Sequence, residues 1–133
     1  MSTKAISNLF STVLHNQFRT GFPFFVGMLI AGRDETGGHI FNYDGSGSIT
    51  DDPYTATGSG MPYALGVLEA LWADDMDEVT AIKTALMAVR SAIIKDLGSG
   101  DGINLFVINK EGLRELSKEE IKQVLGDKYP LAN

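Results

Sequence analysis

Two loops rich in glycine and serine constrain this chain more than any other feature. The first, Thr57-Gly58-Ser59-Gly60, runs into a predicted helix, and the second, residues 96–102, leaves a predicted helix and runs into a strand. A helix that begins after a glycine loop presents free backbone N–H groups and a positive dipole end, so the first loop suits an oxyanion or a carbonyl oxygen. The second loop adds a carboxylate and a hydroxyl. The 40 residues from Ser59 to Ser99 are typical of two helices that fold back, which predicts one composite polar site.

Hydrophobic spacing and turn residues predict alternating helices and strands in the rest of the chain. Helix caps and apolar stripes favour helices over residues 3–18, 61–72, 77–96 and 117–125, the last with a capping box formed by Ser117 and Glu120. Strands are predicted over residues 24–31, 39–43, 54–57, 103–109 and 113–116, with a short one through Ile49. The continuous apolar run of residues 24–31 indicates a strand that is covered on both faces.

This order of elements predicts an α+β fold. The strands follow one another as hairpins and the helices group separately, which is typical of an α+β layered domain and not of a doubly wound one. A chain of 133 residues with 44% hydrophobic residues is long enough to bury one core. We therefore expect one domain over residues 1–126, followed by a flexible tail over residues 127–133.

Composition excludes several classes of function. The net charge of −6 argues against partners such as nucleic acid or an anionic membrane surface, which such a chain would repel. The absence of cysteine excludes a disulfide framework, a thiolate nucleophile and a cysteine-based metal site. His15 and His39 do not stand at metal-ligand spacing, and no lysine follows the Gly-Ser-Gly loop in the spacing of a nucleotide-binding loop. We expect no metal ion and no cofactor.

The chain is also expected to be a soluble cytoplasmic protein. No basic and apolar leader precedes the first predicted helix, and the longest apolar run, residues 22–31, is too short to cross a bilayer.

Several segments of the chain resemble the proteasome β-subunit family. The resemblance rests on Tyr54-Thr55-Ala56-Thr57-Gly58-Ser59-Gly60 and Ser99-Gly100-Asp101-Gly102-Ile103, and it extends through residues 24–32, 38–51 and 113–125 in the family's order. It implies the N-terminal-nucleophile hydrolase fold, a four-layer αββα sandwich of two antiparallel sheets between helical layers. It also implies threonine-type endopeptidase activity on unfolded polypeptides, within rings formed with other β-type and α-type subunits.

The resemblance assigns roles to individual residues. Ser59, Asp96 and Ser99 match the supporting shell that holds the family's N-terminal threonine in register, and Asp101 matches a residue that shapes the loop. The turn that begins at Asp44 resembles a segment that reaches into a neighbour's substrate cleft, which makes Asp44 a candidate substrate contact. The family's opening segment, with its nucleophilic threonine, aspartate and lysine, has no counterpart here. The domain is therefore expected to be N-terminally incomplete, inactive by itself, and associated through an uncovered apolar face.

Other readings of the same residues stay open. Ser59 is also a typical helix N-cap, and Asp96 is placed to form a surface ion pair with Lys95 or Arg90. Ser2 would become an N-terminal nucleophile if the methionine were removed, but it precedes a helix where the family's nucleophile begins a strand. A non-catalytic structural or assembly protein of the same fold is the main alternative function, and an unrelated α+β ligand-binding domain is a weaker one. Retention of all three shell residues favours the catalytic reading.

Overall fold

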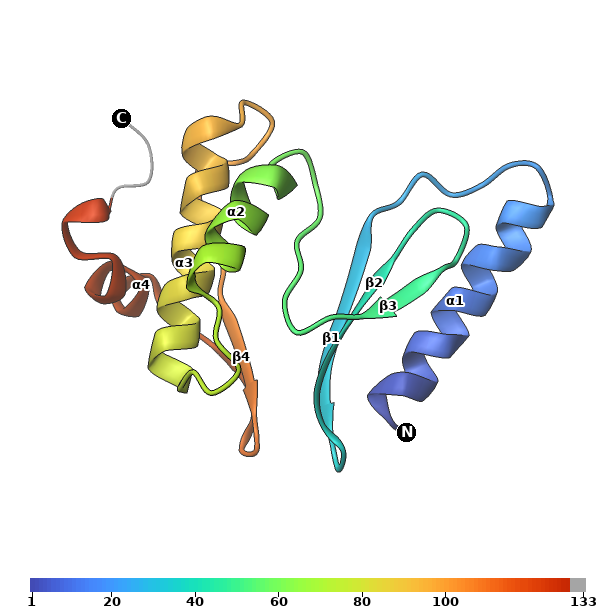
Figure 1. Cartoon of the computed structure of the whole chain (residues 1–133), viewed down its shortest axis with the longest axis horizontal. Coiled ribbons are helices and arrows are strands. Elements are labelled where there is room, and N and C mark those ends of the chain that lie inside the picture. Colours follow the sequence, from blue (N-terminus) through green and yellow to red (C-terminus); the bar gives the residue numbers. More distant parts are fainter. Residues whose placement is uncertain (130–133) are drawn as a thin grey trace. The chain divides into compact units, whose positions relative to one another are not determined.

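The computed structural model describes residues 1–129, which form four helices, five strands and one short 3-10 turn (Figure 1). The chain divides into two compact units: one holds Met1–Thr57 with Ile108–Lys110, and the other holds Gly58–Val107 with the residues from Glu111 onward. Each unit is described by itself below. The expectation of a single domain over residues 1–126 stays a prediction.

The first unit is a helix packed on a three-stranded antiparallel sheet. Helix α1 spans Thr3–Arg19 and is capped by the Ser2 side chain, which accepts a hydrogen bond from the Ala5 backbone N–H at 3.2 Å. Strands β1 (Met28–Asp34), β2 (Gly37–Tyr43) and β3 (Ile49–Asp51) follow in that order across the sheet. Asp34 pairs with Gly37, so β1 and β2 are joined by a two-residue turn.

A small core joins α1 to this sheet. Leu14 of α1 is buried with Phe41 and Tyr43 of β2, and the partly buried Met28, Ile30 and Ile49 pack around them. The Tyr43 hydroxyl donates to the Ser7 backbone oxygen at 2.9 Å and also contacts the Ser7 hydroxyl. These bonds satisfy polar groups that the core would otherwise leave unpaired.

The predicted strand over residues 24–31 is wrong at its start. Strand β1 begins at Met28, whose partner Tyr43 is the last residue of β2, so the preceding residues have no strand to pair with. Phe24 and Phe25 are exposed rather than covered on both faces. The expected extended strand over residues 54–57 is likewise absent from the elements that the structure assigns.

The second unit packs helices around a leucine-rich core. Helix α2 spans Met61–Leu71, α3 spans Glu78–Lys95 and α4 spans Lys118–Leu125. Between α3 and α4 in sequence lies the two-stranded sheet of β4 (Phe106–Asn109) and β5 (Gly112–Glu115), in which the last two residues of β4 are grouped with the first unit. Leu86 of α3 is fully buried at the centre of this core. Around it lie Leu105, Leu116, Ile121 and Leu125.

Two local predictions for this unit have opposite outcomes. The capping box is confirmed, because Ser117 accepts from the Glu120 backbone N–H at 3.2 Å while Glu120 accepts from the Ser117 backbone N–H at 2.7 Å. The predicted buried strand over residues 103–109 is wrong: β4 begins at Phe106, and the Phe106 side chain is exposed. A two-stranded sheet gives β4 only one neighbour, so much of its surface stays uncovered.

The end of the chain is described as far as Tyr129. Residues Gly126–Lys128 form a 3-10 turn, and the Lys128 backbone oxygen accepts a hydrogen bond from Arg90 Nε at 3.0 Å. The rest of the predicted tail, residues 130–133, lies outside the described residues. No helix within residues 1–129 has the length and apolarity needed to cross a membrane.

Candidate functional site

The packing of α2 against α3 places the two glycine-serine loops at the same end of the helix pair. The two helices run side by side (Figure 1), so the loop that precedes α2 meets the loop that follows α3. Gly60 is the N-cap of α2, and Asp96 is the C-cap of α3. The elements that carry Ser59 and Asp96 are thus fixed by the same helix–helix contact.

Two serine side chains converge on one carboxylate oxygen of Asp96 in this place. Ser59 Oγ donates to Asp96 Oδ2 at 2.6 Å, and Ser99 Oγ donates to the same oxygen at 2.7 Å. The Ser99 backbone N–H also donates to the Asp96 backbone oxygen at 3.2 Å, which closes the loop into a turn. The prediction that these residues share one polar site is confirmed.

The hydrogen bonds keep Asp96 ionised. Its pKa lies below the ordinary value of an aspartate, because the Ser59 hydroxyl and then the Ser99 hydroxyl stabilise the carboxylate, with help from the backbone N–H groups of Gly98 and Ser99. Each serine hydroxyl donates its one proton in a hydrogen bond to Asp96, so the lone pairs on the hydroxyl oxygen can still accept hydrogen bonds. The cluster therefore offers acceptors and negative charge, and it suits a ligand that donates N–H bonds.

Two alternative roles, Ser59 as a helix N-cap and Asp96 as a partner in a surface ion pair, are wrong. The N-cap of α2 is Gly60, without a side-chain cap bond, so Ser59 does not cap the helix. Asp96 forms no ion pair within residues 1–129, and Arg90 donates to the Lys128 backbone instead. Its partners are the two serines.

The expectation that the first loop binds an oxyanion is wrong for the start of α2. The backbone N–H groups of Met61 and Tyr63 donate to the backbone oxygens of Gly58 and Gly60, both at 3.1 Å, and Pro62 between them has no N–H. These donors are therefore used inside the helix turn. The chemistry at this end of α2 is that of an acceptor cluster.

Asp44 belongs to the first unit and shapes its own loop. Its Oδ1 accepts from the Ser46 backbone N–H at 2.8 Å, from the Ser46 hydroxyl at 2.6 Å and from the Ser48 backbone N–H at 3.0 Å. The Ser46 hydroxyl is the main reason that the pKa of Asp44 is lowered. The loop also rests on α1, because Ser11 Oγ donates to the Gly47 backbone oxygen at 2.6 Å. Its role as a substrate contact stays a prediction.

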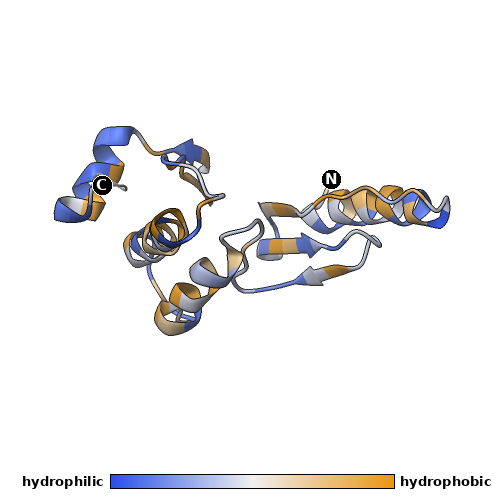
Figure 2. Ribbon diagram, turned by 90° about the horizontal axis from the view of Figure 1, so that it is seen from above, coloured by the Kyte–Doolittle hydropathy of each residue, from blue (hydrophilic) through white to orange (hydrophobic). Residues whose placement is uncertain are grey.

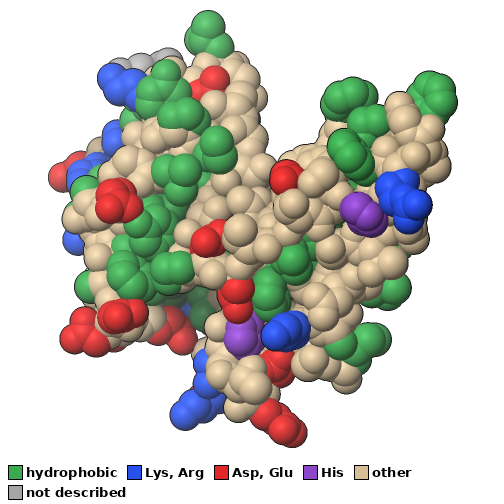
Figure 3. All heavy atoms as spheres, turned by 45° about the vertical axis from the view of Figure 1, so that its right-hand side comes forward, with side chains coloured by type: hydrophobic (Ala, Val, Ile, Leu, Met, Phe, Trp, Pro, Cys, Tyr) green, Lys and Arg blue, Asp and Glu red, His purple; other side chains and the backbone are tan. Residues whose placement is uncertain are grey.

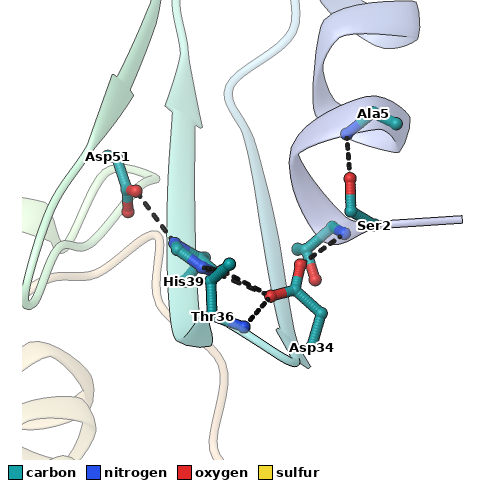
Figure 4. A network of polar contacts seen from close by, with 7 residues as sticks. Ser2, Ala5, Asp34, Thr36, His39 and Asp51 are labelled. Atoms are coloured by element: carbon teal, nitrogen blue, oxygen red, sulfur yellow. Dashed lines mark hydrogen bonds and ion pairs between the residues drawn. The ribbon is translucent and has the colours of Figure 1, made fainter.

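Sequence reasoning missed a second polar cluster, at the β1–β2 turn (Figure 4). Asp34 Oδ2 accepts from the Thr3 backbone N–H at 2.9 Å, which ties the start of α1 to the end of β1. His39 lies between Thr36 Oγ1, at 2.7 Å from Nε2, and Asp51 Oδ2, at 3.0 Å from Nδ1. The spacing of His39 argued only against a metal ligand, and no other role was predicted for it. The spacing of these residues along the sequence does not predict the cluster, because it is the pairing of the strands that brings them together.

This second cluster is not arranged as a metal site. The two ring nitrogens of His39 point to different partners, and within residues 1–129 no group of three His, Cys, Asp or Glu side chains is placed to hold a metal ion. Its visible role is to join α1, β1, β2 and β3.

The chain matches known proteins along most of its length. The family model described as "Proteasome subunit" matches residues 1–108. The "Proteasome subunit beta" of Methanospirillum hungatei is 47% identical over 122 residues, which covers 91% of this chain and 57% of that protein. The "Proteasome subunit beta" of Methanopyrus kandleri is 40% identical over 126 residues, and the "Proteasome subunit beta 1" of Thermococcus onnurineus is 41% identical over 125 residues. Each of these two matches covers 94% of this chain and 60% of the relative.

The chain thus spans about three fifths of the length of these relatives. The α+β composition and the antiparallel pairing agree with the predicted fold class. The chain belongs to the proteasome subunit family, in its β branch, which has the N-terminal-nucleophile hydrolase fold.

Proposed function

We propose that this chain forms part of a catalytic proteasome β-type subunit, a threonine-type endopeptidase that degrades unfolded polypeptides inside a ring of subunits. The observation that carries the proposal is the shared oxygen Oδ2 of Asp96, which accepts the hydroxyl protons of both Ser59 and Ser99. The nucleophilic threonine and its lysine would belong to the part of the subunit that lies outside these 133 residues. The greater length of the relatives is consistent with such a part.

The cluster would act by holding the amine of the nucleophile. In the proposed reaction the threonine hydroxyl attacks the peptide carbonyl, and the free α-amine of the same residue takes up its proton. An amine in this role needs acceptors that fix its direction, and the two hydroxyl oxygens and the Asp96 carboxylate are acceptors held by the helix pair. Ser59, Asp96 and Ser99 are therefore orienting groups, and the attacking group comes from elsewhere.

Uncovered apolar surface supports an assembly of subunits. Hydrophobic residues are spread along α1 in Figure 2, and hydrophobic side chains gather in patches on the surface in Figure 3. Leu9, Val13 and Phe18 of α1 are about half exposed, and Phe25 in the following segment is fully exposed. Exposed apolar side chains that gather in patches are typical of an interface. We propose that the rest of the subunit and neighbouring β-type and α-type subunits cover it.

Two finer points belong to the same proposal. Asp44 would contact substrate from across a subunit interface, with its carboxylate held in a fixed direction by Ser46 and Ser48. The assembly would work in the cytoplasm. It would have no nucleic acid or membrane partners, because a net charge of −6 repels nucleic acid and anionic membrane surfaces.

The test is peptide hydrolysis by the full-length subunit in its assembled ring. The Asp96→Asn variant should lower kcat about 10²-fold, because an amide donates where the carboxylate accepted, and a misplaced amine reacts slowly. Ser59→Ala and Ser99→Ala should each lower kcat less, since one hydroxyl remains. Asp75→Asn is the control: it removes an exposed carboxylate from the turn between α2 and α3, at the end of the helix pair away from the cluster, and it should leave kcat unchanged.

The 133-residue chain by itself should not cleave fluorogenic peptides. Hydrolysis by this chain that survives Asp96→Asn but is lost in Ser2→Ala would favour the N-terminal serine instead. If the rings assemble normally and all three cluster variants keep the kcat of the parent, a non-catalytic structural role is favoured.

A further inference from the structure

The backbone conformation of Gly60 does not require a glycine at this position. Its φ of −80° and ψ of 1° are open to any residue, whereas the neighbouring Gly58 has a φ of +103°, which favours glycine. Gly60 is also buried, at the N-cap of α2. At an N-cap a serine, threonine, aspartate or asparagine usually serves better than glycine. The missing side chain must therefore matter for the space around it.

The space that a side chain would fill is occupied by the candidate site. A Cβ at residue 60 would lie 2.5 Å from Ser99 Oγ and 2.7 Å from Ala92 Cβ, and carbon atoms do not approach other atoms so closely. Ala92 is a buried residue in the last turns of α3. By contrast, a Cβ at Gly66, within the same helix, would meet nothing within 4 Å.

This close approach sets the geometry of the cluster. Gly60 follows Ser59 in the chain, and it faces the hydroxyl of Ser99, so both donors to Asp96 Oδ2 depend on it. A methyl group here must displace the Ser99 hydroxyl or push the start of α2 away from Ala92. The first movement breaks the 2.7 Å bond of Ser99, and the second carries Ser59 away from its 2.6 Å bond.

We propose that Gly60 is a positioning residue of the site: its lack of a side chain lets Ser59 and Ser99 reach the same oxygen of Asp96. The inference builds on the proposed function, since it concerns the residues that would hold the threonine amine. Gly60 touches neither substrate nor nucleophile, and it would act through Ser99 and Ser59.

The experiment replaces Gly60 in the full-length subunit within its assembled ring, with Gly66→Ala as the matched control. Gly60→Ala should lower kcat about tenfold or more and leave KM nearly unchanged, because orientation of the amine is lost while substrate binding is not. Gly66→Ala, the same change in the same helix, should keep kcat within about twofold, since the added methyl meets no atom.

Two double variants separate positioning from helix packing. Ser99→Ala removes the oxygen that the new methyl would strike and leaves the contact with Ala92, so Gly60→Ala should cost less kcat in the Ser99→Ala background than in the parent subunit. Ala92→Gly removes the contact with α3 but not the one with Ser99, so Gly60→Ala combined with Ala92→Gly should regain assembly and thermal stability but not kcat. Recovery of kcat by Ala92→Gly would contradict the part of the proposal that rests on the contact with Ser99, because that contact is still present in this double variant.

A crystal structure of the Gly60→Ala ring gives a result that does not depend on activity. The distance from Ser99 Oγ or Ser59 Oγ to Asp96 Oδ2 should grow beyond about 3.2 Å, the outer limit of a good hydrogen bond. Two intact bonds would overturn the inference whatever the activity. If one of these distances grows but Asp96→Asn keeps the kcat of the parent, the positioning role of Gly60 is supported and the proposed function is contradicted.

Discussion

Truncation of Leu86 tests whether the leucine core of the second unit holds α3, and with it Asp96, in place. Leu86 is fully buried in a cluster with Leu105, Leu116 and Ile121. Leu86→Ala removes three carbon atoms, and at about 0.8 kcal/mol for each buried carbon the lost transfer energy is roughly 2.4 kcal/mol. The cavity that remains adds roughly 1–2 kcal/mol, because the neighbours relax only in part. The expected fall in the free energy of unfolding is about 3.4–4.4 kcal/mol.

Denaturant unfolding followed by circular dichroism measures this loss in the purified protein. Leu97→Ala is the matched control, because Leu97 is fully exposed just after the same helix and its truncation should change stability by no more than about 0.5 kcal/mol. A loss below about 1 kcal/mol for Leu86→Ala would refute the reasoning. So would an equal loss for the two variants, since the argument depends on burial and not on leucine as such.

Two further predictions concern the first unit. Asp34 has a pKa below its ordinary value, chiefly because the Thr36 hydroxyl stabilises the carboxylate. Its contribution to stability is therefore present above about pH 4 and is lost as the pH falls below it. In a pH series of thermal melts, Asp34→Asn should lose less stability below about pH 4 than the parent protein, and parallel curves for the two proteins would contradict the assignment. Gly47→Ala should destabilise the loop that carries Asp44 by roughly 1–3 kcal/mol, because Gly47 has a φ of +88° and a Cβ there would lie 2.7 Å from the His15 backbone nitrogen. Limited proteolysis measures this change: Gly47→Ala should be cleaved faster than the parent protein. Gly45→Ala is the control, because a Cβ there would meet only the Phe24 oxygen at 3.4 Å, and it should resist cleavage like the parent protein. Equal cleavage of the two variants would contradict the role given to the space around Gly47.

Features set by short spacing along the chain could be predicted from the sequence. The capping box needs only Ser117 and Glu120 three residues apart at the start of a helix, and it forms as expected. The convergence of Ser59 and Ser99 on Asp96 followed from two helices of predictable length that return the chain to its starting point. In both cases the geometry of a helix does most of the positioning.

Features that depend on a partner strand could not be predicted in the same way. An apolar run such as residues 24–31 indicates burial, but it does not say whether another strand lies beside it, and β1 begins only where Tyr43 is available to pair. The cluster at His39 has the same origin. The antiparallel register sets Gly32 opposite His39 and Phe41 opposite Asp51, and spacing along one strand carries no information about its neighbour.

The position of Asp96 explains why its partners are hydroxyl groups. As the C-cap of α3 it stands at the negative end of the helix dipole, where a carboxylate is disfavoured. Two hydroxyl protons and the backbone N–H groups of Gly98 and Ser99 offset this cost and lower its pKa. Lysine or arginine partners would stabilise the charge as well, but they would neutralise it, and as groups that only donate they would add no acceptors. Serine partners keep the charge, and their hydroxyl oxygens retain lone pairs that can accept, so the cluster suits the N–H donor of the proposed function, an amine, better than an anion.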